Sequence, residues 1–246
     1  MTVSKNFVLI PFVLSISVAT MAWADTGRSG RVPFVGCASD GQIGPQPAPT
    51  NGRTPAVPPS LAGRLAYYSS GSLGVLAPRG WHCFGLYGSN GSLLIVTPER
   101  HDAADLLTPS STLAGAAIQL SLSSGETSRR FEVAEVAARL FPAKKEFVAR
   151  VIGEGIEPAS AFPEGPYPGD ILHRRSDTEV EFETPAESEG MGTRSRLVKN
   201  GDPIRGLAIV TNENDLVLLD VRVERGLRRL APTIIEATAA AWRTRR

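Results

Sequence analysis

Three glutamates at alternate positions form the densest cluster of side chains that could do chemistry. Glu179, Glu181 and Glu183 lie at i, i+2 and i+4, so an extended segment places all three on one face of a strand. Paired carboxylates can bind a cation or act as acid and base. They also form cross-strand ion pairs, which contribute about 0.2–1 kcal/mol each, and Arg194 and Arg196 alternate likewise on the strand expected next to them. We therefore interpret the glutamates as part of a charged sheet surface and expect no metal site there.

The histidines belong to no motif of nucleophilic catalysis or zinc binding. They are His82, His101 and His173. The sequence contains no G-x-S-x-G elbow, no H-E-x-x-H pair and no close Cys/His cluster. His101 with Asp102 could form half of a dyad, although such a pair in a loop is common. We therefore predict no catalytic residue, no metal ligand and no cofactor. A hydrolase whose residues converge from separate segments is the alternative.

The two cysteines, Cys37 and Cys83, are expected to form one disulfide, because an even pair in an oxidising compartment is most simply bonded. The competing interpretation is a reactive or metal-binding Cys83 beside His82. Neighbouring residues on a strand point to opposite faces, so these two side chains cannot easily act on one atom. The spacing therefore favours the disulfide.

Aromatic residues gather near the second cysteine and offer a weaker functional hypothesis. Tyr67, Tyr68, Trp81 and Tyr87 could line a cleft for a small apolar or sugar-like ligand. Packing of a tryptophan against a disulfide is also ordinary core construction. Both interpretations stay open at this stage.

Residues 1–24 have the pattern of a secretory signal peptide. Lys5 precedes an apolar stretch over residues 7–18, and Ala22-Trp23-Ala24 provides the small residues that signal peptidase accepts. We expect cleavage before Asp25 and a mature protein in the periplasm or outside the cell. The apolar stretch is shorter than the roughly 20 residues that span a membrane, and we expect no transmembrane segment after cleavage.

Composition excludes several classes of protein. The 246 residues are 42% apolar, 21% charged and 7% aromatic, with a formal net charge of +1. This balance is not that of a disordered, collagen-like or multi-span membrane protein. A nucleic-acid partner is not expected without a basic domain. Seven arginines after residue 221 are most simply explained as partners of a helix C-terminus, with binding of phosphate or anionic lipid as the alternative.

The order of predicted elements gives an α+β fold. An irregular Pro/Gly-rich arm over residues 25–60, with seven Pro and six Gly, precedes a single domain over residues 61–246. Helical spacing predicts helices over residues 133–141, 142–152 and 232–243. Strands are expected over residues 73–77, 81–87, 92–97, 116–122, 178–184, 192–199, 207–211 and 216–223. We therefore predict an antiparallel sheet with helices packed on it.

Two segments carry a resemblance to known proteins. Residues 35–42 (VGCASDGQ) and 74–85 (GVLAPRGWHCFG) resemble uncharacterised exported bacterial proteins, a likeness that implies no activity. Tyr67-Tyr68, Gly74-Val75 and the run APRGW at 77–81 also resemble the opening hairpin of the PsbP/Mog1-like α/β/α sandwich. That likeness covers residues 61–243 and implies an accessory or binding protein without a catalytic centre. It assigns no site residues to this chain.

Together these observations predict an exported, soluble, non-enzymatic binding or accessory protein of the bacterial envelope. Its partner would be an envelope protein or a small molecule that the sequence does not identify.

Overall fold

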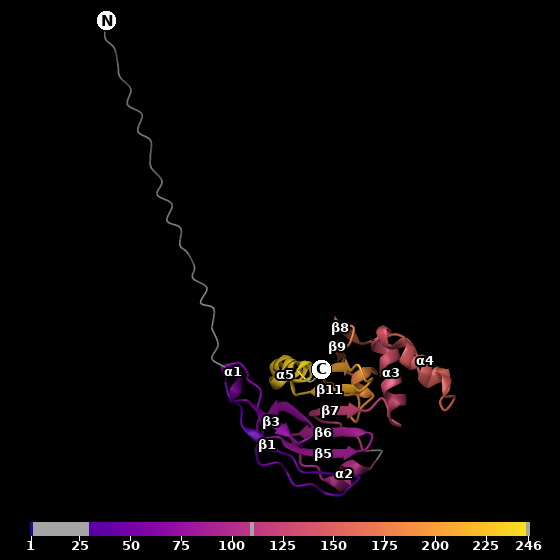
Figure 1. Ribbon diagram of the computed structural model, residues 1–246. Helices are drawn as coiled ribbons and strands as arrows, with labels where there is room; N and C mark the ends of the chain where they lie inside the picture. The colour runs from indigo at the N-terminus through magenta and orange to yellow at the C-terminus, as the bar shows by residue number, and fades with distance from the viewer. Residues whose placement is uncertain (2–29, 109–110, 245–246) are drawn as a thin grey trace.

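The computed structural model describes residue 1 and residues 30–108 and 111–244 (Figure 1). The predicted signal peptide and its cleavage site lie outside the described residues, apart from Met1. Within the described part, no helix is both long enough and apolar enough to span a membrane.

A large sheet of eight strands forms the centre of the protein. In spatial order its strands are β2 (Ser39–Gly41), β5 (His82–Gly88), β6 (Gly91–Thr97), β7 (Ala117–Ser123), β11 (Leu216–Arg222), β10 (Ile204–Val210), β9 (Glu179–Thr184) and β8 (Ile171–Ser176). All neighbouring strands are antiparallel except β2 and β5, which are parallel. The two predicted hairpins, β5–β6 and β10–β11, are confirmed.

One face of this sheet is covered by a smaller sheet and the last helix. The smaller sheet has the order β1 (Phe34–Gly36), β3 (Leu65–Ser69) and β4 (Gly74–Pro78), and α5 (Ala231–Arg243) packs against β4, β10 and β11. Leu207 and Leu219 of the large sheet contact this layer, in a cluster that includes Leu76 and Ile234. This face therefore holds the larger core.

The opposite face is covered in two separate places. The helices α3 (Arg130–Leu140) and α4 (Lys145–Gly153) lie over the β9–β10–β11 half, where Phe182 and Ala208 pack with Val133 and Phe147. The short helix α2 (Ala103–Leu107) covers the other half with a smaller cluster around Ile95. Figure 1 shows α2 near β5 and α3 with α4 at the far end of the sheet. The part of the sheet between these two coverings is not covered by a helix, and a groove lies there.

The α+β class is confirmed, and so are the three predicted long helices. The remaining helical elements are α1 (Pro59–Ala62) and 3-10 helices at Pro142–Lys144, Ala159–Ala161, Met191–Thr193 and Arg225–Leu230. Adjacent residues on β10, such as Leu207 and Ala208, belong to different clusters, so these strands are buried on both faces. On β7 the polar residue Gln119 is also buried, at 4% exposure, because the segment around Arg196 covers it.

The strand predicted over residues 192–199 is wrong. A 3-10 helix occupies Met191–Thr193, and the residues that follow make only an isolated bridge between Leu197 and Leu113. The neighbours of β9 are β8 and β10. Because β8 is an exposed edge strand rich in Arg and His, its sequence lacks the apolar alternation that reveals a half-buried strand.

The three glutamates of β9 form ion pairs as predicted, but Glu179 is buried, at 4% exposure, and the predicted arginine partners are wrong. Glu179 and Glu181 contact Arg175 of β8, Glu183 contacts Arg205 of β10, and Arg243 of α5 also reaches Glu179. Arg194 and Arg196 lie elsewhere, because their segment is not a strand of this sheet. The glutamates therefore have a structural role in tying β8, β9, β10 and α5 together.

Candidate ligand-binding groove

The gap between the two helical coverings forms a groove of about 630 Å³. Its walls come from the β5–β6 hairpin on one side, and from the start of α3 and residues 194–196 on the other. β7 and β11 provide the floor. The groove therefore joins segments that are far apart in the sequence.

The floor is polar because β7 alternates. Ile118 and Leu120 point into the larger core, so Gln119, Ser121 and Ser123 lie on the groove face. Gln119 also accepts a hydrogen bond of 3.3 Å from the backbone N–H of Arg196. This bond fixes one wall of the groove to its floor.

Three arginines and one glutamate are the charged residues that line the groove: Arg129, Arg194, Arg196 and Glu132. Arg129 pairs with Glu132, and Arg194 pairs at 2.9 Å with Glu135, which lies outside the lining. The Arg196 guanidinium donates to the carbonyl oxygens of Thr108 and Ser111, at 3.4 and 3.3 Å. Burial and the positive charge of Arg129 lower the pKa of Arg196. This part of the groove is therefore electropositive.

A buried carboxyl group lies next to the floor of the groove. Asp220 is fully buried and directly opposite Gln119 across the β7–β11 pair, so both side chains lie on the same face of the sheet. Neither carboxyl oxygen of Asp220 has a hydrogen-bond partner among the described residues. Burial raises its pKa to about 8, although the hydroxyl of Ser195 and the charge of Arg222 act in the opposite direction. Asp220 is therefore mostly protonated at neutral pH.

Arg222 fixes the loops that flank this part of the groove. Its side chain is almost fully buried, at 1% exposure, and its guanidinium donates to the carbonyl oxygens of Leu113, Gly115 and Val198. One buried cation thereby joins the segment before β7 to the segment after residues 194–196.

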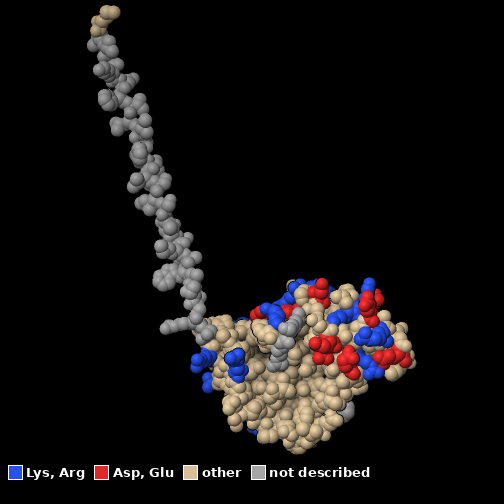
Figure 2. Space-filling model, in the orientation of Figure 1, with Lys and Arg blue, Asp and Glu red and all other residues tan. Residues whose placement is uncertain are grey.

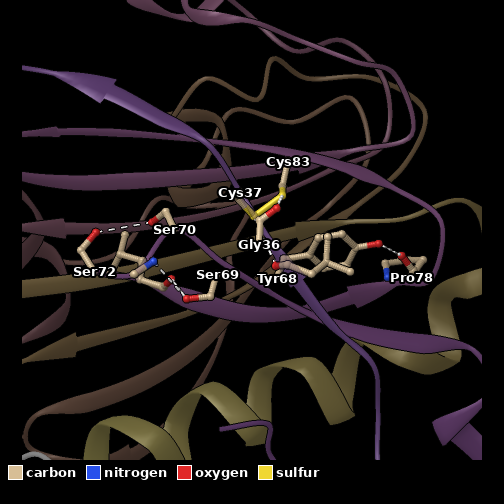
Figure 3. Close-up of a disulfide and its surroundings, with 11 residues drawn as sticks. Gly36, Cys37, Tyr68, Ser69, Ser70, Ser72, Pro78 and Cys83 are labelled. Carbon is tan, nitrogen blue, oxygen red and sulfur yellow. Dashed lines mark hydrogen bonds between the residues drawn. A yellow bond between two sulfur atoms is a disulfide. The ribbon is translucent and has the colours of Figure 1, made fainter. Parts of the chain in front are cut away.

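The predicted aromatic residues are distributed over several parts of the fold. Tyr87 lines the groove. Tyr68 is fully buried, and its hydroxyl donates a hydrogen bond of 2.9 Å to the carbonyl of Pro78 (Figure 3). Tyr67 contacts Phe34, and Trp81 packs against the larger core. Of these four aromatic residues, Tyr87 is the one that lines the groove. A ligand cleft formed by all four stays a prediction.

The predicted disulfide is confirmed. The Sγ atoms of Cys37 and Cys83 are 2.08 Å apart, and the bond joins the N-terminal arm to β5 (Figure 3). The arm is also held by two strand pairings, of β1 with β3 and of β2 with β5. Because Cys83 is bonded, it supplies neither a free thiol nor a metal-binding thiolate. The disulfide is consistent with an oxidising, exported compartment.

The histidine dyad considered from the sequence has a different geometry. Asp102 is the N-cap of α2 and accepts a hydrogen bond from the N–H of Asp105, while His101 lies 3.8 Å from the Asp105 carboxylate. Within residues 30–108 and 111–244, no group of three or more His, Cys, Asp or Glu side chains could hold a metal ion.

Several C-terminal arginines have structural partners. Arg222 is buried, Arg228 pairs with Asp202, and Arg243 in the last turn of α5 pairs with Glu236 and Glu179. Arg228 also lines a second cavity of about 360 Å³ near the start of α5. The position of Arg243 agrees with the expected pairing of arginine with a helix C-terminus.

No family model, curated protein or solved structure matches the chain. The function of the groove must therefore be argued from its own residues. The alternation of side chains along the predicted strand over residues 116–122 places Gln119 and Ser121 on the same face. Nothing in the sequence showed that Arg129 and Arg196 would meet beside them, since those positions depend on tertiary packing.

Proposed function

We propose that this protein is an exported, non-enzymatic binding or accessory protein and that the groove on its large sheet is the ligand site. The observation that carries the proposal is the groove itself. Its volume of about 630 Å³ lies within the range of roughly 300–1,000 Å³ typical of small-molecule sites. Serine, glutamine and arginine side chains converge on it from several elements. A small polar molecule is the ligand that such a lining favours.

The groove chemistry favours binding over nucleophilic hydrolysis. Ser121, Ser123 and Ser195 provide hydroxyl groups, but none of the three histidines is among the lining residues. The Ser195 hydroxyl donates to the carbonyl of Gly192 and accepts from the N–H of Leu197. A serine nucleophile needs an adjacent base. The Asp220 carboxyl beside Ser195 is mostly protonated at neutral pH, and the Ser195 hydroxyl is bonded within its own loop. The hydrolase alternative would need residues from another part of the fold.

The cellular location that we propose is the periplasm or the extracellular space. The Cys37–Cys83 bond and the signal-peptide pattern of residues 1–24 support it. The resemblance to the PsbP/Mog1-like sandwich, whose members are mostly accessory or binding proteins, agrees with a function without turnover. An envelope protein as a further partner stays a prediction.

A ligand screen with a blocked groove tests the proposal. Saccharides, amino acids, hydroxy acids and dipeptides are screened against the disulfide-bonded protein by saturation-transfer NMR. The Ser121→Trp variant fills the groove from its floor, and Ser60→Trp on the exposed surface of α1 is the matched control. We expect at least one compound to bind the wild type and the control but not Ser121→Trp. If no compound depends on Ser121 in this way, the proposed function is wrong.

The same screen addresses the enzyme alternative. Compounds that bind are incubated with the protein and analysed for conversion by mass spectrometry. An unchanged ligand supports binding without turnover. Conversion that disappears in His101→Ala or His173→Ala would instead establish the hydrolase.

A further inference from the structure

We propose that the groove binds a small hydroxylated acid, with the ligand carboxylate placed against Arg196 and Arg129. This inference rests on the proposed ligand site and specifies the chemistry of its ligand. It comes from a cation without an acidic partner, from the charge balance of the lining, and from the neutral polar groups in the remainder of the groove.

Arg196 is the lining arginine that has no carboxylate partner in the described structure. Arg129 contacts Glu132 and Arg194 contacts Glu135, whereas among the described residues the Arg196 guanidinium donates to the carbonyl oxygens of Thr108 and Ser111. These bonds are long, at 3.4 and 3.3 Å. The planar guanidinium matches a carboxylate through two parallel hydrogen bonds. A ligand carboxylate would therefore supply the counter-ion that the protein does not provide.

The charge balance favours an anion at this position. The three lining arginines face two carboxylates, Glu132 in the lining and Glu135 just outside it, which leaves a formal charge of +1. Arg129 also lies near enough to Arg196 to lower its pKa by charge repulsion. An anion that contacts both guanidinium groups offsets this repulsion. A cationic ligand would increase it.

The remainder of the lining carries no charge. It presents amide and hydroxyl groups from Gln42, Ser89, Asn90 and Ser121, with Leu86 and Leu93 beside them, while Gln119 and Ser123 are buried in the floor. The surface around the groove is divided in the same way into a charged and an uncharged part. Figure 2 shows charged side chains gathered around α3 and α4, whereas the surface formed by β5, β6 and α2 is nearly uncharged. Neutral donors and acceptors match ligand hydroxyls. A sugar acid combines these hydroxyls with one carboxylate.

Calorimetric titration with three matched compounds tests the inference: glucuronate, glucose and glucose 6-phosphate. A charge-assisted contact strengthens binding by at least about tenfold, so we expect glucuronate to bind at least tenfold more tightly than glucose. Equal affinities for glucose and glucuronate would overturn the inference, as would failure of all three to bind. A preference for glucose 6-phosphate over glucuronate would overturn the carboxylate assignment.

Arginine variants show where the acid binds. We expect Arg196→Gln to lower the affinity for glucuronate at least about tenfold and to change the affinity for glucose less than about twofold. Arg129→Gln is the second variant, because the Arg129 side chain pairs with Glu132 and its removal leaves the contacts of Arg196 with Thr108 and Ser111 intact. Arg229→Gln, exposed and outside the groove, makes the same charge change as a control. An equal loss in Arg229→Gln would show only a general charge effect and overturn the inference.

The screen and the titration fail in different ways. Glucose binding that Ser121→Trp abolishes, with no gain for glucuronate, would retain the groove as the ligand site and overturn the acid. A complete absence of compounds sensitive to Ser121→Trp would overturn both proposals.

Discussion

Gln119 and Asp220 lie directly opposite each other on β7 and β11, and both side chains face the groove side of the sheet. Gln119 accepts a hydrogen bond from the backbone of Arg196, whereas both oxygens of Asp220 lack a partner among the described residues. The two positions therefore contribute differently. Gln119 fixes the wall of the groove. Asp220 is a buried acid whose burial favours the protonated form, so its ionisation lowers the stability of the fold.

The stability of the protein should fall as the pH rises from about 4 to about 8. An unfolded aspartate has a pKa near 3.9, and burial raises that of Asp220 to about 8. Between these values the folded state retains a proton that the unfolded state has released, so each rise in pH favours unfolding. We expect a loss of about 3.5 kcal/mol in the free energy of unfolding between pH 5 and pH 8, measured by urea denaturation.

Asp220→Asn tests this assignment because asparagine resembles the protonated acid. The variant should lack most of the loss between pH 5 and pH 8, while Asp177→Asn, an exposed control on the β8–β9 turn, should retain it. An unchanged pH dependence in Asp220→Asn would show that other groups control the profile.

Arg222 should be among the least replaceable side chains. Removal of its guanidinium leaves the carbonyls of Leu113, Gly115 and Val198 without their donor. A buried acceptor that loses its donor costs about 1–3 kcal/mol, so with three carbonyls affected we expect Arg222→Ala to lower the free energy of unfolding by at least about 3 kcal/mol in urea. Arg225→Ala, at an exposed position nearby, should change stability by less than about 0.5 kcal/mol. Equal effects of the two substitutions would contradict the role given to Arg222.

Local patterns in the sequence were sufficient for the elements that bury one clear face or pair with a chain neighbour. The β10–β11 hairpin joins two apolar runs through a polar turn, in which Asn214 adopts a left-handed conformation with φ of 63°. The helix α3 has apolar residues at helical spacing and ends before Pro142. In both cases the residues that determine the structure are close together in the chain.

Elements defined by distant partners could not be predicted in this way. The edge strand β8 is polar because most of its side chains are exposed, and Arg175 finds its glutamates on β9 and α5. The segment that contains Arg194 and Arg196 alternates like a strand, yet it bonds to Gln119 and to carbonyls near α2. The electropositive part of the groove is therefore a product of tertiary structure alone.

Export should produce a shortened and oxidised protein. If signal peptidase cleaves before Asp25, as the pattern at residues 22–24 indicates, protein exported by its own leader should have the mass of residues 25–246 less two hydrogens. Denaturing mass spectrometry measures both changes together. Recovery of the full-length mass from the exported fraction would contradict cleavage, and a mass two units higher would indicate reduced thiols.

The disulfide should stabilise the fold chiefly by restricting the unfolded chain. It closes a loop with a sequence separation of 46 residues, for which the chain-entropy model gives about 4 kcal/mol and measured values are typically about 2–4. Removal of both thiols in Cys37→Ala/Cys83→Ala should therefore lower the free energy of unfolding by about 2–4 kcal/mol in urea.

The effect of a reductant on stability distinguishes the contribution of the covalent bond from that of the packing of the two cysteine side chains. Dithiothreitol should lower the stability of the wild type to nearly that of the double variant and leave the variant unchanged. Hydrogen exchange should quicken first in the arm, at backbone groups such as the Cys37 N–H, which donates to the carbonyl of Ser69. A wild type whose stability is insensitive to complete reduction would show that the packed arm, through contacts such as buried Val57, holds itself without the covalent bond.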